Sequence, residues 1–314
     1  MNSDRPLHPR MSEHSRAKRV GWPPTGHART RWLVGTCLAG AVLIFNPSSA
    51  SAYPTPGALG LGTAATFSVL AATTVTNSGA TVISADAGAG GNLGVSPGTA
   101  VTGFPDGLVT APGTIHAGDA SAATAQIDAG TAAVTGAGLP PNQTFTPVYD
   151  LVGQIFTAGV YAAPTSLALG GAGASVTLDG ENNPDAVFIF QIGSTLVTGA
   201  SSTVSLVNGA QACNVFWIVG SSATLGANST FNGTILAAAS ASLGDGVDVQ
   251  GRVLAGTGAV TLLNGTIHTP TCAPSSGVSA APLLGTSAWA AGGTAFVAGG
   301  VLLMVHRRRR LLTS

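Results

Sequence analysis

Three consecutive stretches of eighteen residues in the C-terminal half of the chain repeat one another without gaps. They cover 214–231 (NVFWIVGSSATLGANSTF), 232–249 (NGTILAAASASLGDGVDV) and 250–267 (QGRVLAGTGAVTLLNGTI). Apolar residues occupy the same columns, as Ile218 and Leu236 do. One such stretch cannot bury its own apolar residues, whereas stacked stretches share one continuous core. The repeat therefore predicts a parallel β-helix with one repeat per turn.

Other columns of the repeat agree with this register. Ala223, Ala241 and Ala259 share a column, and segment 188–204 (FIFQIGSTLVTGASSTV) fits the same frame one turn earlier. Successive side chains of a strand point to opposite faces, so an inward Ala223 places Thr224 on the surface. Stacked turns lie about 4.8 Å apart, and we therefore expect outward columns to form regular ladders.

One segment of the body has the pattern of an α-helix. Asp119 can cap a helix that runs to about Thr135, in which Ala123, Ile127 and Val134 lie at roughly helical spacing. A short alanine-rich helix is marginal by itself, so we expect it to pack against the β-helix. The first strand of the repeat is the most apolar of the three, and we expect that strand to lie under the helix.

The charge distribution excludes some classes of partner. Between Tyr53 and His306, Arg252 is the one basic residue against ten acidic ones, so this part carries about −9. Phosphate contacts need Lys and Arg, and we therefore predict no nucleic-acid partner. Binding to anionic lipid surfaces is disfavoured for the same reason.

The N-terminal residues 1–52 have the pattern of a secretory signal peptide. A basic and polar start precedes the apolar run 32–45, and Ala50-Ser51-Ala52 supplies a small-residue cleavage pattern. We expect the mature chain to begin at Tyr53 and to work outside the cytoplasm.

The C-terminal residues have the pattern of a membrane anchor. Residues 287–305 carry no charge, and this run is long enough for a transmembrane helix. A basic tail follows at 306–314. Residues 273–286 form a linker rich in Pro, Ser, Gly and Ala. The positive-inside rule places the tail in the cytoplasm. The sequence thus predicts that the domain 53–272 lies at the extracellular face of the cell membrane, tethered by the C-terminal helix.

Two cysteines, Cys213 and Cys272, remain after removal of the signal peptide. In an oxidising compartment they form a disulfide or stay as two unpaired buried thiols, and the sequence leaves both arrangements open. The body has only His116 and His268 and no Cys-x-x-Cys pair, so we predict no metal and no cofactor.

With these residues in view, the body resembles the widespread microbial family of ice-binding proteins. The resemblance is carried by 61–70 (LGTAATFSVL), 92–98 (NLGVSPG), 187–196 (VFIFQIGSTL) and above all 214–266. It implies an all-β, right-handed, three-faced parallel β-helix with one α-helix alongside, closed by contact between its first and last turns. With the C-terminal transmembrane helix added, this is the predicted fold class. The resemblance also implies that an ice crystal surface is the partner and that there is no enzymatic activity. We expect a monomer.

Column alternation assigns the expected ice-binding face. Such a face should be flat, regular and weakly charged, because a hydroxyl can join an ordered water layer while a charged group holds water in another geometry. The predicted face is the uncharged hydroxyl ladder on the second strand of the turns: Thr195, Ser222, Thr224, Ser240 and Ser242. The alternative face is the third-strand column, which the carboxylate of Asp248 interrupts: Thr203, Thr230 and Thr266.

Two other functions remain as alternatives. A surface adhesin of the same fold would hold the cell to a ligand other than ice. A polysaccharide-active enzyme would need paired carboxylates or a basic group in a groove. Asp245 and Asp248 are close in sequence, but one bridges a corner and the other faces outward, and Arg252 lies in no acidic cluster. We therefore predict that the chain is not an enzyme.

Overall fold

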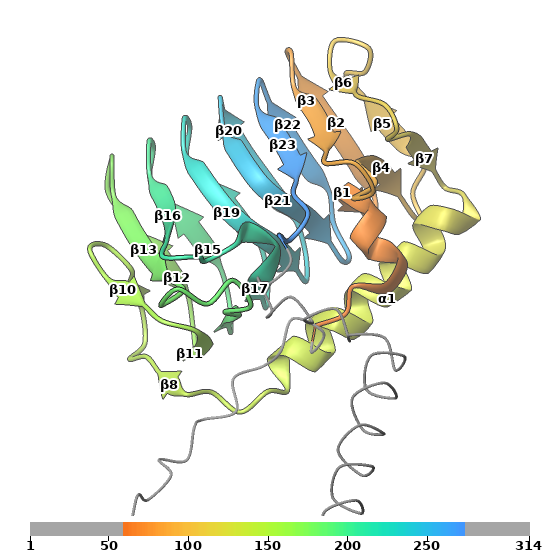
Figure 1. Cartoon of the computed structure of the whole chain (residues 1–314). Helices are drawn as coiled ribbons and strands as arrows, with labels where there is room; N and C mark the ends of the chain where they lie inside the picture. The colour runs from red at the N-terminus through yellow and green to blue at the C-terminus, as the bar shows by residue number, and fades with distance from the viewer. Residues whose placement is uncertain (1–58, 274–314) are drawn as a thin grey trace, which may run out of the picture. The chain divides into compact units, whose positions relative to one another are not determined.

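The computed structural model describes residues 59–273, which form a stack of short parallel strands with one α-helix alongside (Figure 1). The predicted signal peptide 1–52, transmembrane segment 287–305 and basic tail 306–314 lie outside the described residues, as does the linker after its first residue.

The predicted fold class needs one correction. It included a transmembrane helix, but within 59–273 no helix is long and apolar enough to cross a membrane. The α-helix that the structure does contain, α1 (Ala120–Ala137), lies against the strands. The fold is mostly β with one helix, and the transmembrane helix is withdrawn from it.

The strands form three faces, which we number in the order in which a turn visits them. Face 1 lies under α1: β7 (Ile115–Ala117), β4 (Asn92–Val95), β1 (Phe67–Ala71), β21 (Asp248–Ala255), β19 (Thr230–Ala237), β17 (Val215–Val219), β14 (Phe188–Ile192), β11 (Gly159–Ala163) and β8 (Gln143–Thr144).

Face 2 is a separate eight-stranded sheet: β5 (Ala100–Thr102), β2 (Thr74–Ser78), β22 (Val260–Leu263), β20 (Ala241–Asp245), β18 (Ala223–Leu225), β15 (Leu196–Thr198), β12 (Leu167–Leu169) and β9 (Tyr149–Asp150). Face 3 contains the first halves of β21 and β19 and six shorter strands: β6 (Leu108–Val109), β3 (Val82–Ala85), β23 (Thr266–Thr269), β16 (Thr203–Val207), β13 (Ser175–Asp179) and β10 (Ile155–Phe156).

The chain does not follow the stack from end to end. The turn made by β1, β2 and β3 lies between the turn of β4 to β6 and the last turn, made by β21, β22 and β23. Helix α1 then runs along face 1, and the remaining turns lead back from β8 to β23 (Figure 1). The first and last turns are therefore neighbours, as the resemblance implied, and we call their contact the seam.

The eighteen-residue repeat gives most of the observed register. Leu236 lies opposite both Ile218 and Leu254, as predicted. The prediction for the third alanine was wrong, because Ala241 lies opposite Val260 rather than Ala259. The corner before β22 holds one additional residue, and a bulge in β20 after Ser242 restores the register.

The core has two apolar layers. Inside the β-helix, aromatic rings stack from turn to turn, as the rings of Phe190 and Trp217 do at 4.2 Å. Outside face 1, Phe216 and Ile218 pack against α1, so the apolar strand lies under the helix as predicted. These layers fix the direction of every outward column on faces 2 and 3.

Helix α1 begins where the sequence indicated. Asp119 is its N-cap, and its Oδ1 accepts a hydrogen bond from the N–H of Ala122 at 2.9 Å. The expected apolar stripe was wrong, since Ile127 and Val134 are 70% and 75% exposed. Small residues face the sheet instead: Ala122, Ala125, Ala129, Ala132 and Gly136. They let the helix approach closely, because a Cβ at Gly136 would lie 3.0 Å from Ile218.

Candidate functional site

One outward column runs along the whole of face 2. Its residues lie opposite one another from turn to turn, in this order: Thr102, Thr76, Thr261, Ser242, Thr224, Val197, Ala168 and Asp150. The first five carry hydroxyl groups, and all five side chains are exposed. We call these five residues the hydroxyl ladder. Their spacing is set by the strands at about 4.8 Å per turn.

A column of glycines keeps the surface low beside this column. Gly170, Gly199, Gly226 and Gly244 each follow their strand's outward residue by two positions. A Cβ at Gly244 would lie 2.7 Å from the backbone nitrogen of Ala227 in the neighbouring turn, so no side chain fits there. This strip of bare backbone borders Ser242, Thr224, Val197 and Ala168, whereas Leu263, Ser78 and Phe104 occupy the corresponding positions beside Thr261, Thr76 and Thr102.

On its other side, the hydroxyl ladder borders a column of half-buried hydroxyl groups. The hydroxyls of Ser166 and Thr195 lie 2.8 Å apart and share a hydrogen bond. Ser222 Oγ accepts the N–H of Ser240 at 3.4 Å, and Ser240 Oγ accepts the N–H of Ala259 at 3.3 Å. These groups join neighbouring turns at the corner between faces 1 and 2, and we call them the corner column.

The structure thus divides the predicted face into two columns. Thr224 and Ser242 belong to the exposed hydroxyl ladder, while Thr195, Ser222 and Ser240 belong to the corner column. Sequence reasoning missed the other ladder residues: Thr76, Thr102 and Thr261. The alternation of Thr74, Val75 and Thr76 could have shown that this strand has a hydroxyl face, but not on which turn it stacks.

Charge is confined to the end of the outward column of face 2. Asp150 lies three turns beyond Thr224, and its Oδ1 accepts the N–H groups of Val152 and Gly170, each at 3.1 Å. The five residues of the hydroxyl ladder, which form its rungs from Thr102 to Thr224, carry no charge. The hydroxyl ladder therefore offers an uncharged and mildly polar column, and the carboxylate of Asp245 lies at the end of β20, three positions after Ser242.

The alternative face is different in character. Thr230 lies opposite Thr203 on one side and Asp248 on the other, and Thr266 Oγ1 donates to Asp248 Oδ1 at 2.8 Å. Further along face 3, His268 Nε2 lies 3.0 Å from Asp86 Oδ1. The hydrogen bond from the N–H of Thr271 lowers the pKa of Asp86 most, and the hydrogen bond with the His268 side chain lowers it further. Face 3 thus carries ionisable groups in and beside its outward column, whereas the hydroxyl ladder of face 2 carries none.

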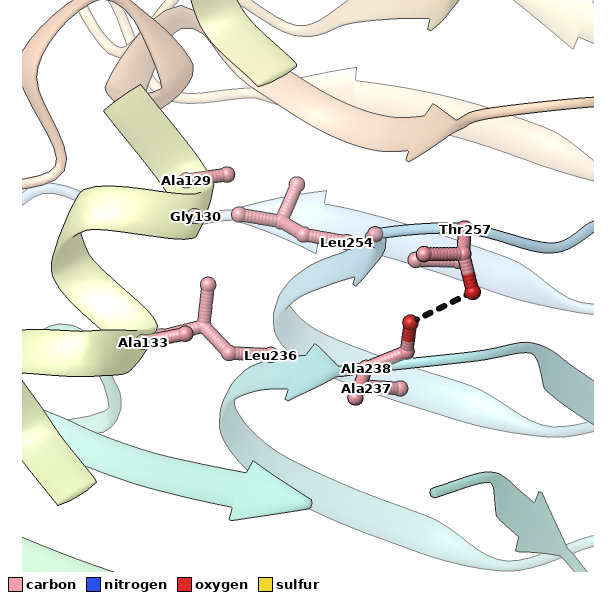
Figure 2. Close-up of a pocket in the computed structure, with 10 residues that line it drawn as sticks. Ala129, Gly130, Ala133, Leu236, Ala237, Ala238, Leu254 and Thr257 are labelled. Atoms are coloured by element: carbon pink, nitrogen blue, oxygen red, sulfur yellow. Dashed lines mark hydrogen bonds between the residues drawn. The ribbon is translucent and has the colours of Figure 1, made fainter. Parts of the chain in front are cut away.

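Two hollows of the described structure lie beside α1. One of them has a mixed lining that includes Thr63, Asn92 and His116, and the other is almost entirely apolar. A cavity of about 260 Å³ lies between α1 and the turns of β19 and β21, with Leu236 and Leu254 beneath it (Figure 2). Its lining is alanine, glycine and leucine apart from Thr257, whose Oγ1 donates to the carbonyl of Ala238 at 2.8 Å. Within 59–273, no group of three or more His, Cys, Asp or Glu side chains could hold a metal ion.

A disulfide holds the C-terminal end of the described chain against the β-helix. It joins Cys213, just before β17, to Cys272, just after β23, with Cα atoms 5.7 Å apart. Gln211 Nε2 donates to the carbonyl of Ala273, and Gln211 Oε1 accepts the N–H of Ala273. Residues 271–273 are thereby attached to the segment of the β-helix that precedes β17.

These features define a β-helix protein that carries an exposed column of hydroxyl groups on one face. A family model described as ice-binding-like matches residues 69–268. The chain belongs to this family, and the predicted membership is confirmed.

Known proteins similar to this chain carry the corresponding names. An ice-binding protein of Nostoc sp. (strain HG1) is 47% identical over 203 residues, which cover 64% of this chain and 71% of that protein. The crystal structure of an ice-binding protein from the Antarctic ascomycete Antarctomyces psychrotrophicus matches with a TM-score of 0.61 and 41% identity, covering 69% of this chain and 98% of that one. An ice-binding protein from an Antarctic biological consortium gives 0.62 and 38%, covering 67% and 90%.

Proposed function

We propose that this chain adsorbs to ice crystals through the hydroxyl ladder of face 2. The observation that carries the proposal is the run of five exposed Thr and Ser residues on five consecutive turns, from Thr102 to Thr224. Each hydroxyl can join an ordered water layer, and each threonine methyl limits competing hydration. Since the strands repeat the groups at a fixed spacing, the ladder can match a periodic crystal surface.

Membership of the ice-binding-like family supports the proposal, as do the names of its similar relatives. The contrast between faces supports it further. A carboxylate such as Asp248 on face 3 holds its own water shell, which would have to be removed at an ice surface. The uncharged rungs of face 2 impose no such penalty.

We also propose that the chain works outside the cytoplasm. The pattern of residues 1–52 is typical of secretion, and the bond between Cys213 and Cys272 suits an oxidising compartment. Fractionation of cells that express the intact chain tests this proposal. Protein found only in the cytoplasm would contradict it.

Thermal hysteresis and ice-crystal shaping of the purified protein test the ice-binding proposal. We expect faceted crystals and a gap between melting and freezing points. Thr224→Tyr should abolish both effects, because a bulky ring stands above the ladder and separates its neighbours from the ice. Thr230→Tyr on face 3 is the matched control and should leave both unchanged. The reverse result would move the site to face 3, and a folded wild type without either effect would exclude ice binding.

A further inference from the structure

The hydroxyl ladder crosses the seam between Thr76 and Thr261. Thr261 comes from the last turn of the described chain and Thr76 from the first, yet they lie opposite one another. Within 214–267 one repeat of chain covalently links each rung to the next, but no such short link joins these two rungs. Their alignment therefore depends on noncovalent contacts across the seam, where β1 pairs with β21, β2 with β22 and β3 with β23.

The other neighbour of Thr261 is also irregular. Strand β20, which carries Ser242, has its bulge between Ser242 and Asp245, on the side where it pairs with β22. A bulge bends its strand and locally disrupts the ladder of hydrogen bonds. The rung at Thr261 thus has a bulged strand on one side and the seam on the other.

Asn264 bonds to both irregular neighbours. Its Oδ1 accepts the N–H of Ala80 across the seam at 2.9 Å, and its Nδ2 donates to Asp245 Oδ1 beside the bulge at 2.8 Å. Its backbone is left-handed, with φ at 47°, a conformation that Asn tolerates. Across the seam a Cβ at Gly79 would collide with Asn264 Oδ1, so the opposing turn leaves room for this side chain.

We propose that Asn264 is a positioning residue for ice binding. Its side chain holds the three turns that carry Ser242, Thr261 and Thr76 in register, although it lies at the corner and not in the hydroxyl ladder. This inference rests on the proposed function, because the ladder must be the surface that meets ice. The hydrogen bond between positions 264 and 245 is the contact that matters, whichever of the two residues donates it.

Three variants test this inference in the full protein. Asn264→Asp keeps the acceptor for Ala80 but sets a second carboxylate against Asp245. The double variant Asn264→Asp with Asp245→Asn returns the amide to the pair with donor and acceptor exchanged. Asn228→Asp is the matched control, because Asn228 occupies the equivalent corner one turn beyond Gly246, is left-handed at 56°, and gains the same charge.

The readouts are thermal hysteresis and hydrogen exchange at the amide of Ala80, with circular dichroism as the check on folding. For Asn264→Asp we expect repulsion from Asp245 to move the side chain at position 264 away from Ala80. Hysteresis should then fall at least about twofold, and exchange at Ala80 should rise about fivefold, the effect of one weakened hydrogen bond. The double variant should regain both values, and Asn228→Asp should keep them. Recovery in the double variant assigns the loss of hysteresis to the hydrogen bond between positions 264 and 245, and an unchanged circular dichroism melt of Asn264→Asp distinguishes lost register from lost stability.

The outcomes separate the two claims. If the wild type shows no hysteresis, the proposed function fails, whatever the variants do. If the wild type is active and Asn264→Asp matches it, the inference about Asn264 is overturned while ice binding stands. Loss of activity in both Asn264→Asp and the double variant, with both folded, would also overturn it, because the restored hydrogen bond would then have no effect.

Discussion

At one corner of the β-helix, residues of different types adopt the same left-handed backbone conformation. Between faces 2 and 3, Gly173, Ser201, Asn228, Gly246 and Asn264 all have positive φ, from 47° to 71°. In each turn the N–H of this residue bonds to the carbonyl just before its counterpart in the next turn, as in Ser201 to Ala227. This conformation is energetically unfavourable for residues that have a Cβ atom, and it is less unfavourable for Asn than for most of them.

Replacement of Gly173 by alanine should measure this conformational cost. Nothing lies within 4 Å of a Cβ at Gly173, so Gly173→Ala tests the backbone alone, and we expect it to lower the free energy of unfolding by about 1 kcal/mol. The opposite sign is expected for Gly130→Ala, since Gly130 is exposed in α1, has equally open space, and gains about 1 kcal/mol of helix propensity. Urea unfolding of the two variants checks the prediction, and a common sign would contradict it.

Among the elements, those that repeat were predictable and those at irregular corners were not. Side-chain alternation in β17 to β19 follows from identical spacing, so Thr224 could be placed on the surface. Gapless superposition of the repeats missed the slip at Ala259, although the alternation of Val260, Thr261 and Leu262 indicates that Val260 points inward. In α1 the spacing of Ile127 and Val134 is genuinely helical, but the sheet selects the alanine stripe, which allows closer contact.

The N-terminus of α1 should respond to acid through its cap. The hydrogen bond from the N–H of Ala122 lowers the pKa of Asp119 most, and the hydrogen bond with the His116 side chain lowers it further. A carboxyl whose folded pKa is lowered stabilises the protein above its unfolded pKa, and this contribution is lost as pH falls through the folded pKa. We therefore expect stability to decline below about pH 4, and Asp119→Asn to reduce that decline while keeping a capping side chain.

Thermal melts from about pH 5 to about pH 2 measure this dependence. Asp106→Asn removes an exposed carboxylate away from the helix and serves as the control, which should retain the slope of the wild type. A variant at position 119 whose slope also equals that of the wild type would show that the cap does not contribute.

At the scale of the whole β-helix, the contact between the first and last turns was expected from the family resemblance, and the pattern of the residues alone did not predict it. The rule that consecutive turns are neighbours correctly places β1 beside β4. The same rule gives no reason to place β1 beside β21, which belongs to the last turn. Only stacking brings Thr76 and Thr102 onto the ladder that Thr224 and Ser242 begin. The face was therefore predictable in its chemistry and in its central turns, but not in its extent.

The extent of the ladder leads to a gain-of-function prediction. Beyond Thr224 the same column continues with Val197 and Ala168, whose positions are set by the same strand pairings. If the area of matched hydroxyls limits adsorption, Val197→Thr with Ala168→Thr lengthens the ladder from five rungs to seven, and thermal hysteresis should rise. The substitution of Val197 is close to isosteric, and its side chain is 45% exposed, so we expect a change in stability of no more than about 0.5 kcal/mol.

Val207→Thr on face 3 is the matched control, because this exposed valine adds a hydroxyl outside the ladder. It should leave hysteresis unchanged. A rise in the control equal to that of the double variant would mean that surface polarity, and not the register of face 2, sets the activity. No rise in a folded double variant would show that ice contacts end at Thr224, which would confine the binding surface to the five turns around the seam.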